Sequence, residues 1–378
     1  MAIMTGLSGN EMYCLHLKGF SPGELVVGNS VYSMGFFGTL GSGVQTMLGG
    51  EVDPVTKVIH DGRAHSLQRM TQEAEKHGGI GITGCSGEII QQGGTAEFLS
   101  IGSCIHHEGN RVEKLAFSTS ADGQELYCQL DAGFMPVKFV FGNVAYSIGI
   151  GGGILGAFRA LARGEVREYS DVFNETRHRA LWRITEEARQ AGANSVVGIQ
   201  TTILPFGGMQ EMVMIGTASR HGALPEEFNT RPITSDLTNE EMWNIIHMGY
   251  MPIQLVLGVS VYSLGFVGSI TASLKSLARG EIEQMSSLLY EARDNALKRI
   301  RADAELCGAD DVVGIKTYVY QLSSGLIEFM AMGTAVKKMP GMKTLTDFLP
   351  AQAVMKDKDT YFNAAEKSLG ANLNDAKR

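Results

Sequence analysis

The strongest constraint on this chain is that one eleven-residue segment occurs three times. The copies are GNSVYSMGFFG from Gly28, GNVAYSIGIGG from Gly142 and GVSVYSLGFVG from Gly258. They lie 114 and then 116 residues apart, and flanking segments repeat at the same offsets. Such a period is too long for a solenoid repeat and fits a small complete domain. The chain of 378 residues is therefore predicted to contain three tandem domains.

The repeats are placed at residues 1–108, 109–222 and 223–340, followed by a tail at 341–378. The spacers between them carry turn and cap residues, and we expect them to be ordered only in part. Each repeat begins with the spacing of a helix capping box, and a glycine then ends the first helix. These positions are Ser8 and Glu11, Asp122 and Glu125, Thr238 and Glu241, with Gly19, Gly133 and Gly249 as the terminating glycines.

The rest of each repeat predicts a strand, a short glycine-rich helix, a long helix and two final strands. Gly28 interrupts the first strand, which suggests a bulge or a close backbone approach. In the long helix of the second repeat, Phe173 and Ile184 belong to an apolar stripe, with Arg177 and Arg183 off it. The fold class is α+β, as three tandem copies of a small helix-strand-helix-helix-strand-strand domain.

Composition excludes several classes of protein. The net charge of −8 and the pI of about 5.6 argue against binding to nucleic acid or to an anionic membrane. No stretch reaches the roughly 18 apolar residues of a membrane-spanning helix, and we see no signal peptide. Five cysteines without a CxxC pair are typical of free thiols in a reducing compartment. The expected location is the cytoplasm.

Several recurrent motifs resemble the YbjQ family, whose members are described as heavy-metal-binding domains. The clearest are GANSVVGI from Gly192, GADDVVGI from Gly308, and GTA at Gly216 and Gly333. The first repeat departs from them, with GGIGITGC from Gly78. The resemblance covers most of each repeat. It implies a small α+β domain that assembles into rings of five.

The best candidate for a metal site is Cys104, His106 and His107, at the end of the first repeat. Sulfur and nitrogen ligands at this spacing could hold Zn or Cu. The cluster does not recur: the second repeat has Ala218, Arg220 and His221 there, and the third has no Cys or His. We therefore expect no cofactor, and the alternative for these residues is a strand end with polar caps.

One charged pattern does recur. Its members are Arg69, Arg183 and Arg299 in the long helices and Glu97, Glu211 and Glu328 in the final strands. A structural ion pair, within a domain or across an interface, is the favoured interpretation, with Glu211 meeting Arg183. A catalytic carboxylate is the alternative, but no recurrent nucleophile or histidine accompanies it, and we assign no catalytic or cofactor-binding residue.

Three functions are compatible with these patterns. A structural or scaffold protein that forms homo-oligomers is favoured, because the repeated segment is charge-free packing surface. A metal-binding or metal-responsive protein is the first alternative, and an enzyme is the second. The resemblance favours a pentamer of three stacked tiers, the alternative being a flat ring of two or three chains with domains in sequence. The tail is a docking segment for a protein partner or a frayed end.

Overall fold

The computed structural model describes residues 2–33, 50–92, 94–107, 112–147, 164–206, 209–263, 283–323 and 326–354. The short glycine-rich helix predicted in each repeat falls within 34–49, 148–163 and 264–282, which lie outside the described residues. The remaining elements follow the predicted order. The fold is α+β, with three repeated sheet units.

Each repeat contains a short helix, a long first strand, a long helix and a two-stranded hairpin, and the first two repeats also contain a two-residue strand before the long helix. The first repeat contains α1 (Gly9–Leu17), β1 (Phe20–Ser33), β2 (Gly50–Glu51), α4 (Asp53–Lys76), β3 (Gly81–Gln92) and β4 (Thr95–His107). The second contains α5 (Gly123–Asp131), β6 (Met135–Ser147), β7 (Gly164–Glu165), α7 (Arg167–Gln190), β8 (Ser195–Phe206) and β9 (Met209–Arg220). The third contains α8 (Asn239–His247), β11 (Tyr250–Ser263), α10 (Glu283–Leu306), β12 (Asp311–Ser323) and β13 (Leu326–Lys338).

The spacers and the tail contribute short elements of their own. They are β5 (Phe117–Ser118), the 3-10 turn η1 (Glu226–Asn229), β10 (Ile233–Thr234) and α11 (Ala351–Val354). The predicted helix ends are confirmed. All three short helices begin with a reciprocal capping box, and Gly19, Gly133 and Gly249 follow them at positive φ. The capping boxes satisfy backbone N–H donors that the first turn of each helix leaves unpaired.

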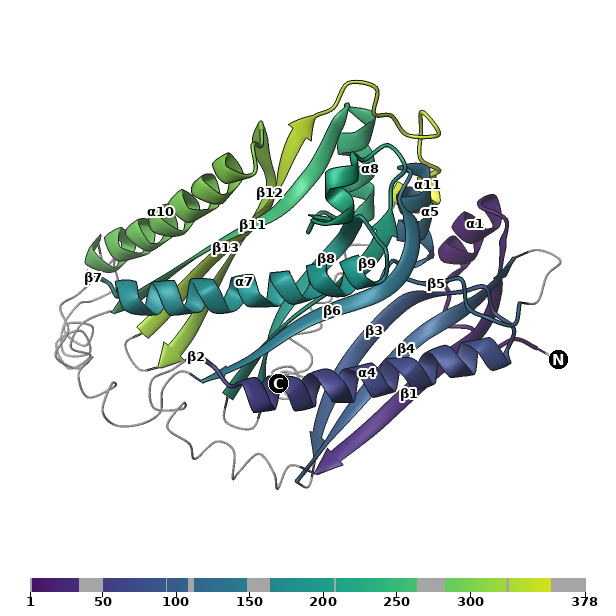
Figure 1. The fold of residues 1–378 in the computed structure, drawn as a ribbon, viewed down its shortest axis with the longest axis horizontal. Coiled ribbons are helices and arrows are strands. Elements are labelled where there is room, and N and C mark those ends of the chain that lie inside the picture. The colour runs from purple at the N-terminus through teal and green to yellow at the C-terminus, as the bar shows by residue number, and fades with distance from the viewer. Residues whose placement is uncertain are drawn as a thin grey trace, which may run out of the picture.

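The three sheets lie side by side, and the helices α4, α7 and α10 run along them (Figure 1). The strand orders are β1-β4-β3-β5, β10-β8-β9-β6-β2 and β12-β13-β11-β7. Each sheet contains a strand from a neighbouring repeat. The spacer strands β5 and β10 pair in parallel with the hairpin of the repeat before them, whereas β2 and β7 pair with the first strand of the repeat after them. Among the described residues, the middle sheet alone gains a strand at both edges.

The recurrent glycine of the first strand marks a close approach between strand and helix. A Cβ added to Gly142 would collide with the Ala180 carbonyl and the Ile184 amide of α7, and Gly28 and Gly258 face their own helices in the same way. The register shifts of these strands lie near their beginnings instead. Of the two roles predicted for the glycine, the structure therefore shows the close approach.

Replacing this glycine by alanine is expected to force strand and helix apart. We expect Gly142→Ala to lower the free energy of unfolding by about 1–3 kcal/mol, the usual cost of overpacking. Gly222→Ala is the control, because an added Cβ there meets nothing within 4 Å. Urea denaturation measures both. An unchanged midpoint for Gly142→Ala would contradict the close approach.

Candidate functional site

The long helices α4 and α7 are buried on two faces rather than one. Each packs on the sheet of its own repeat and on the first strand of the next, so that α4 touches β6 and α7 touches β11. The apolar clusters accordingly cross the repeat boundary. Leu67 of α4 packs with Phe139 and Phe141 of β6, and the core around α7 continues into Leu255 and Leu257 of β11.

A buried ion pair lies in the first of these interfaces. Arg63 of α4 donates to both carboxylate oxygens of Glu211 in β9, from Nε at 3.2 Å and from Nη2 at 2.8 Å. Glu211 is fully buried, and Arg63 is nearly so. Two parallel hydrogen bonds between a guanidinium and a carboxylate fix orientation as well as distance. The pair therefore sets how the second repeat sits against the first.

The second interface repeats this arrangement one domain further along. Arg177 of α7 donates from Nη2 to both oxygens of Glu328 in β13, at 2.9 and 2.8 Å, and both side chains are fully buried. The guanidinium also donates to the hydroxyl of Tyr146 at 2.7 Å and lies 4.3 Å from that ring's centroid. Stacking and hydrogen bonding at Nε and Nη2 offset part of the arginine's lost hydration.

These contacts correct two predictions. Glu211 pairs with Arg63 rather than with Arg183, and Arg177 is buried rather than off the apolar stripe. A single apolar stripe predicts one buried face for each helix, whereas the next repeat covers a second. A sequence signal was present, because Arg63 and Arg177 each stand four residues after one apolar residue and four before another. An arginine in such a row is a candidate for a buried partner.

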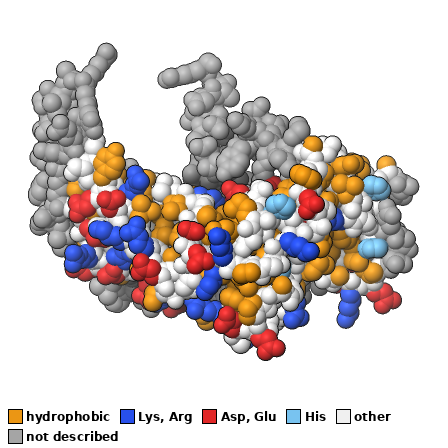
Figure 2. Space-filling view, turned by 90° about the horizontal axis from the view of Figure 1, so that it is seen from above, with side chains coloured by type: hydrophobic (Ala, Val, Ile, Leu, Met, Phe, Trp, Pro, Cys, Tyr) orange, Lys and Arg blue, Asp and Glu red, His pale blue; other side chains and the backbone are white. Residues whose placement is uncertain are grey.

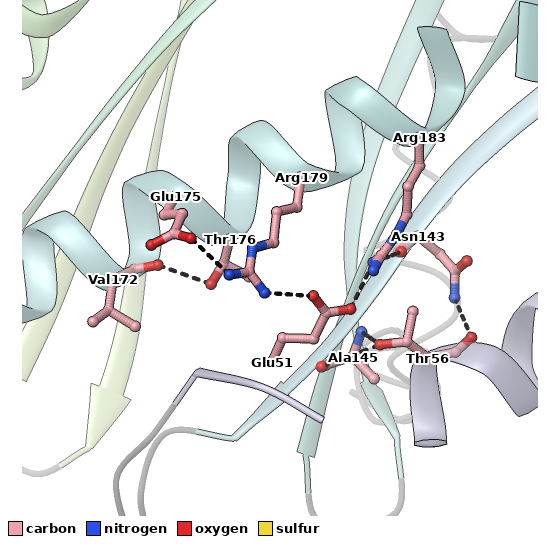
Figure 3. A network of polar contacts seen from close by, with 9 residues as sticks. All are labelled: Glu51, Thr56, Asn143, Ala145, Val172, Glu175, Thr176, Arg179 and Arg183. Carbon is pink, nitrogen blue, oxygen red and sulfur yellow. Dashed lines mark hydrogen bonds and ion pairs between the residues drawn. The ribbon is translucent and has the colours of Figure 1, made fainter. Parts of the chain in front are cut away.

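The arginines predicted to meet Glu211 and Glu328 bind a different carboxylate across the same interfaces. Arg183 and Arg179 of α7 donate to Glu51 in β2 at 2.6 and 3.0 Å (Figure 3). Thr56 of α4 accepts a hydrogen bond from the Ala145 amide at 2.9 Å beside them. In the third repeat Arg299 lies 3.8 Å from Glu165 of β7. Glu51 and Glu165, the second residues of β2 and β7, thus anchor these two-residue strands.

Glu51 is almost completely buried in this network. Burial by itself would raise the pKa of its carboxyl, but hydrogen bonds from Arg183 and Arg179 lower that pKa below its usual value. The charged form is therefore the one that the interface stabilises.

The short helices form a second junction around Asp131 of α5, which is fully buried. Its carboxylate accepts hydrogen bonds from Lys18 Nζ at 2.7 Å, Trp243 Nε1 at 2.8 Å and Thr346 Oγ1 at 2.7 Å. These donors come from the first repeat, the third repeat and the tail. Ala353 of α11 is buried in an apolar cluster that also contains Trp243. The described part of the predicted docking tail thus packs within the chain.

The three candidate metal ligands are not brought together. Cys104 is buried in the core beneath α4, while His106 approaches the Gly78 carbonyl at 3.2 Å and His107 packs edge-on against Phe20. Burial raises the pKa of the Cys104 thiol to about 11, which keeps it protonated at neutral pH and a poor ligand. Strand alternation places His107 on the face opposite to Cys104. These residues do not fit a metal centre, and no cluster of three potential ligands occurs among the described residues.

Two of the three recurrent carboxylates are held in buried ion pairs. Glu211 and Glu328 are each engaged by an arginine, and burial raises the pKa of the neighbouring Tyr146 to about 12. On the face shown in Figure 2, basic and acidic side chains are interspersed and form no continuous basic surface. None of the described helices combines the length and apolarity needed to cross a membrane. Four of the six recurrent charged residues, Glu211, Glu328, Arg183 and Arg299, make ion pairs between repeats.

A family model matches each repeat separately. The family described as "Putative heavy-metal-binding" matches residues 21–106, 135–221 and 249–339. The chain belongs to this YbjQ family. The predicted resemblance is confirmed, and the YbjQ domain occurs here in three tandem copies.

Relatives of known sequence share one or more of these domains. The encapsulin nanocompartment protein Rv1762c of Mycobacterium tuberculosis is 32% identical over 228 residues, which cover 57% of this chain and 83% of that protein. A UPF0145 protein of Pseudothermotoga lettingae is 45% identical over 83 residues, or 22% of this chain and 78% of the relative. A UPF0145 protein of Thermosipho melanesiensis is 37% identical over 86 residues, which cover 23% of this chain and 80% of that relative.

Breaking one partner of the buried pair is expected to be costly. Arg177→Met leaves Glu328 charged and buried, and it should lower the free energy of unfolding by about 3–5 kcal/mol. Combining it with Glu328→Leu should recover most of that loss, because no uncompensated charge remains. Arg189→Met is the control on the same helix, since its pair with Glu186 is largely exposed. Urea denaturation in which Arg177→Met behaves like the control would refute the buried pair.

The interface around Glu51 is expected to weaken in acid. Because the folded state lowers this pKa, the contribution of Glu51 is complete above its unfolded value of about 4.3 and disappears as pH falls through the lower folded value. Thermal unfolding between about pH 6 and pH 3 should show a shallower acid loss for Glu51→Gln than for the parent. Glu88→Gln, on an exposed carboxyl, should follow the parent. Identical profiles for all three would exclude this role.

Proposed function

We propose that this chain is a non-catalytic assembly protein of the cytoplasm, which forms homo-oligomers and has a structural role in a protein compartment. The proposal rests on the ion pairs that the recurrent charged residues make between repeats. Arg63 and Arg177 meet Glu211 and Glu328, while Arg183 and Arg299 lie against Glu51 and Glu165, always across a boundary between repeats. These repeated residues form a surface on which another YbjQ domain docks.

The name of one relative supports the compartment. The Mycobacterium tuberculosis protein is called an encapsulin nanocompartment protein, and 83% of it aligns with this chain. We propose that this chain also acts in a protein compartment. In addition, the end of the tail, beyond residue 354, is the proposed segment for binding a protein partner. Heavy-metal binding is less well supported, because Cys104 and His107 point to opposite faces of one strand.

Two arrangements of the oligomer follow from the sequence: a three-tier stack of five chains, and end-to-end joining of two or three chains. The contacts within the chain support the second. Ala145 and Val261, in the second and third copies of the repeated segment, are already covered by the preceding repeat. In the described parts of those copies, residues 142–147 and 258–263, the side chains are buried within the chain, which leaves little surface there for the same repeat of a neighbouring chain.

Native mass spectrometry of the purified full-length chain is the test of assembly. We expect a homo-oligomer of two or three chains. Five chains would favour the stack, and a stable monomer at micromolar concentration would refute an assembly function. Sedimentation of a lysate of the native cells tests the compartment. The chain should migrate with particles much larger than the purified oligomer, and migration at the size of the oligomer alone would remove the compartment role.

A further inference from the structure

The two ends of the chain each lack one half of the contact that joins its repeats. The middle sheet has five strands, because it receives β10 at one edge and β2 at the other. The first sheet has no such strand beside β1, and the third has none beside β12, among the residues that the structure describes. In the described residues, the first sheet therefore has no cover from a preceding repeat, and the third has none from a following repeat.

The outer face of β1 shows the first deficit. Leu25, Val27 and Val31 are exposed, with 59% of Val31 accessible to solvent. The matching residues of β6 and β11 are nearly or completely buried: Phe139, Phe141 and Ala145, and Leu255, Leu257 and Val261. Those strands are covered by α4 and α7 of the preceding repeat. An aliphatic strip of this kind in water marks an interaction surface.

The helix α10 shows the second deficit. Leu289 and Arg293 of α10 are exposed, although the equivalent Ile59 and Arg63 of α4, and Phe173 and Arg177 of α7, are buried against the next repeat. Across the described residues, Arg293 makes no ion pair. The end of the molecule that carries α10 displays closely mixed acidic and basic side chains (Figure 2).

The carboxylate that would complete this contact stands at the opposite end of the chain. Glu97 is the equivalent of Glu211 and Glu328, yet it is only half-buried and accepts a hydrogen bond from Asn29 Nδ2 at 3.2 Å. No arginine or lysine of the described ranges pairs with it. Arg293 and Glu97 are thus complementary charges that the chain cannot bring together itself.

The N-terminal segment supplies a third match. Ile3 and Met4 align with Phe117 and Ser118 of β5 and with Ile233 and Thr234 of β10. Those residues add to the outer edge of the preceding hairpin, at Gly81 and Ile82 and at Ser195 and Val196. The equivalent edge of the third repeat is Asp311 and Val312 in β12. Met4 is 77% exposed, as expected for a segment whose sheet belongs to another molecule.

We infer that the third repeat of one copy docks on the first repeat of a second copy, through the same contact that joins successive repeats within the chain. Arg293 of one copy pairs with Glu97 of the next, Leu289 covers the aliphatic face of β1, and residues 3–4 add to the edge of β12. The occupant is a second copy of this chain, because the two faces are complementary in charge and continue an interface already present twice. This inference rests on the proposed assembly function and names its contact.

Charge reversal tests the contact, read by native mass spectrometry of the full chain. Arg293→Glu and Glu97→Arg should each reduce the oligomer at least tenfold relative to monomer, whereas the double variant should restore it. An equimolar mixture of the two single variants should assemble only into species with equal numbers of each. Lys298→Glu is the control, because its equivalents Gln68 and Trp182 stay exposed in both formed interfaces. Circular dichroism checks that each variant is folded.

The outcomes separate this inference from the function on which it rests. A monomeric parent would overturn both. An oligomeric parent whose Arg293→Glu and Glu97→Arg variants assemble as fully as Lys298→Glu would overturn the contact alone. Loss of assembly in the single variants without recovery in either the double variant or the mixture would also overturn the pairing of Arg293 with Glu97.

Discussion

The first strand of each repeat is apolar on both faces, and this one constraint organises the molecule. A long helix of the same repeat covers one face, held close by the glycine at Gly28, Gly142 or Gly258. The other face is covered from outside the repeat, because the described residues of each domain contain one helix of that length. Within the chain the preceding repeat supplies it, so burial and domain order are fixed by the same contact.

The buried Arg–Glu pairs add direction to that apolar contact. Hydrophobic burial alone tolerates sliding and rotation of one domain on another, whereas a bidentate pair such as Arg177 with Glu328 accepts one alignment. Its role in stability is different: the desolvation of two charges offsets much of their attraction. We therefore interpret the pair as setting register, and the network of Glu51 with Arg183 as holding the exchanged strand. This arrangement supports the proposed assembly function, since it joins one YbjQ domain to the next through a defined contact.

Sequence reasoning could predict what is local or repeated. The capping boxes at Ser8, Asp122 and Thr238, the helix-ending glycines and the α+β order all follow from short-range chemistry. The pairing of Glu211 could not be predicted in the same way, because its partner lies 148 residues away on a helix assumed to bury one face. The exchanged strands β2 and β5 were missed for a related reason. Two residues carry too little pattern to indicate a strand whose partner belongs to another repeat.

The central claim is that the outer face of the first strand needs cover from another domain in all three repeats. Hydrogen–deuterium exchange of the intact oligomer tests it most directly, by comparing peptides from β1 with those from β6 and β11. We expect the amides of Val27–Ser33 to be protected like their equivalents in β6 and β11, and to become fast-exchanging when Arg293→Glu separates the chains. Fast exchange of β1 in the parent oligomer, unchanged in that variant, would contradict the account.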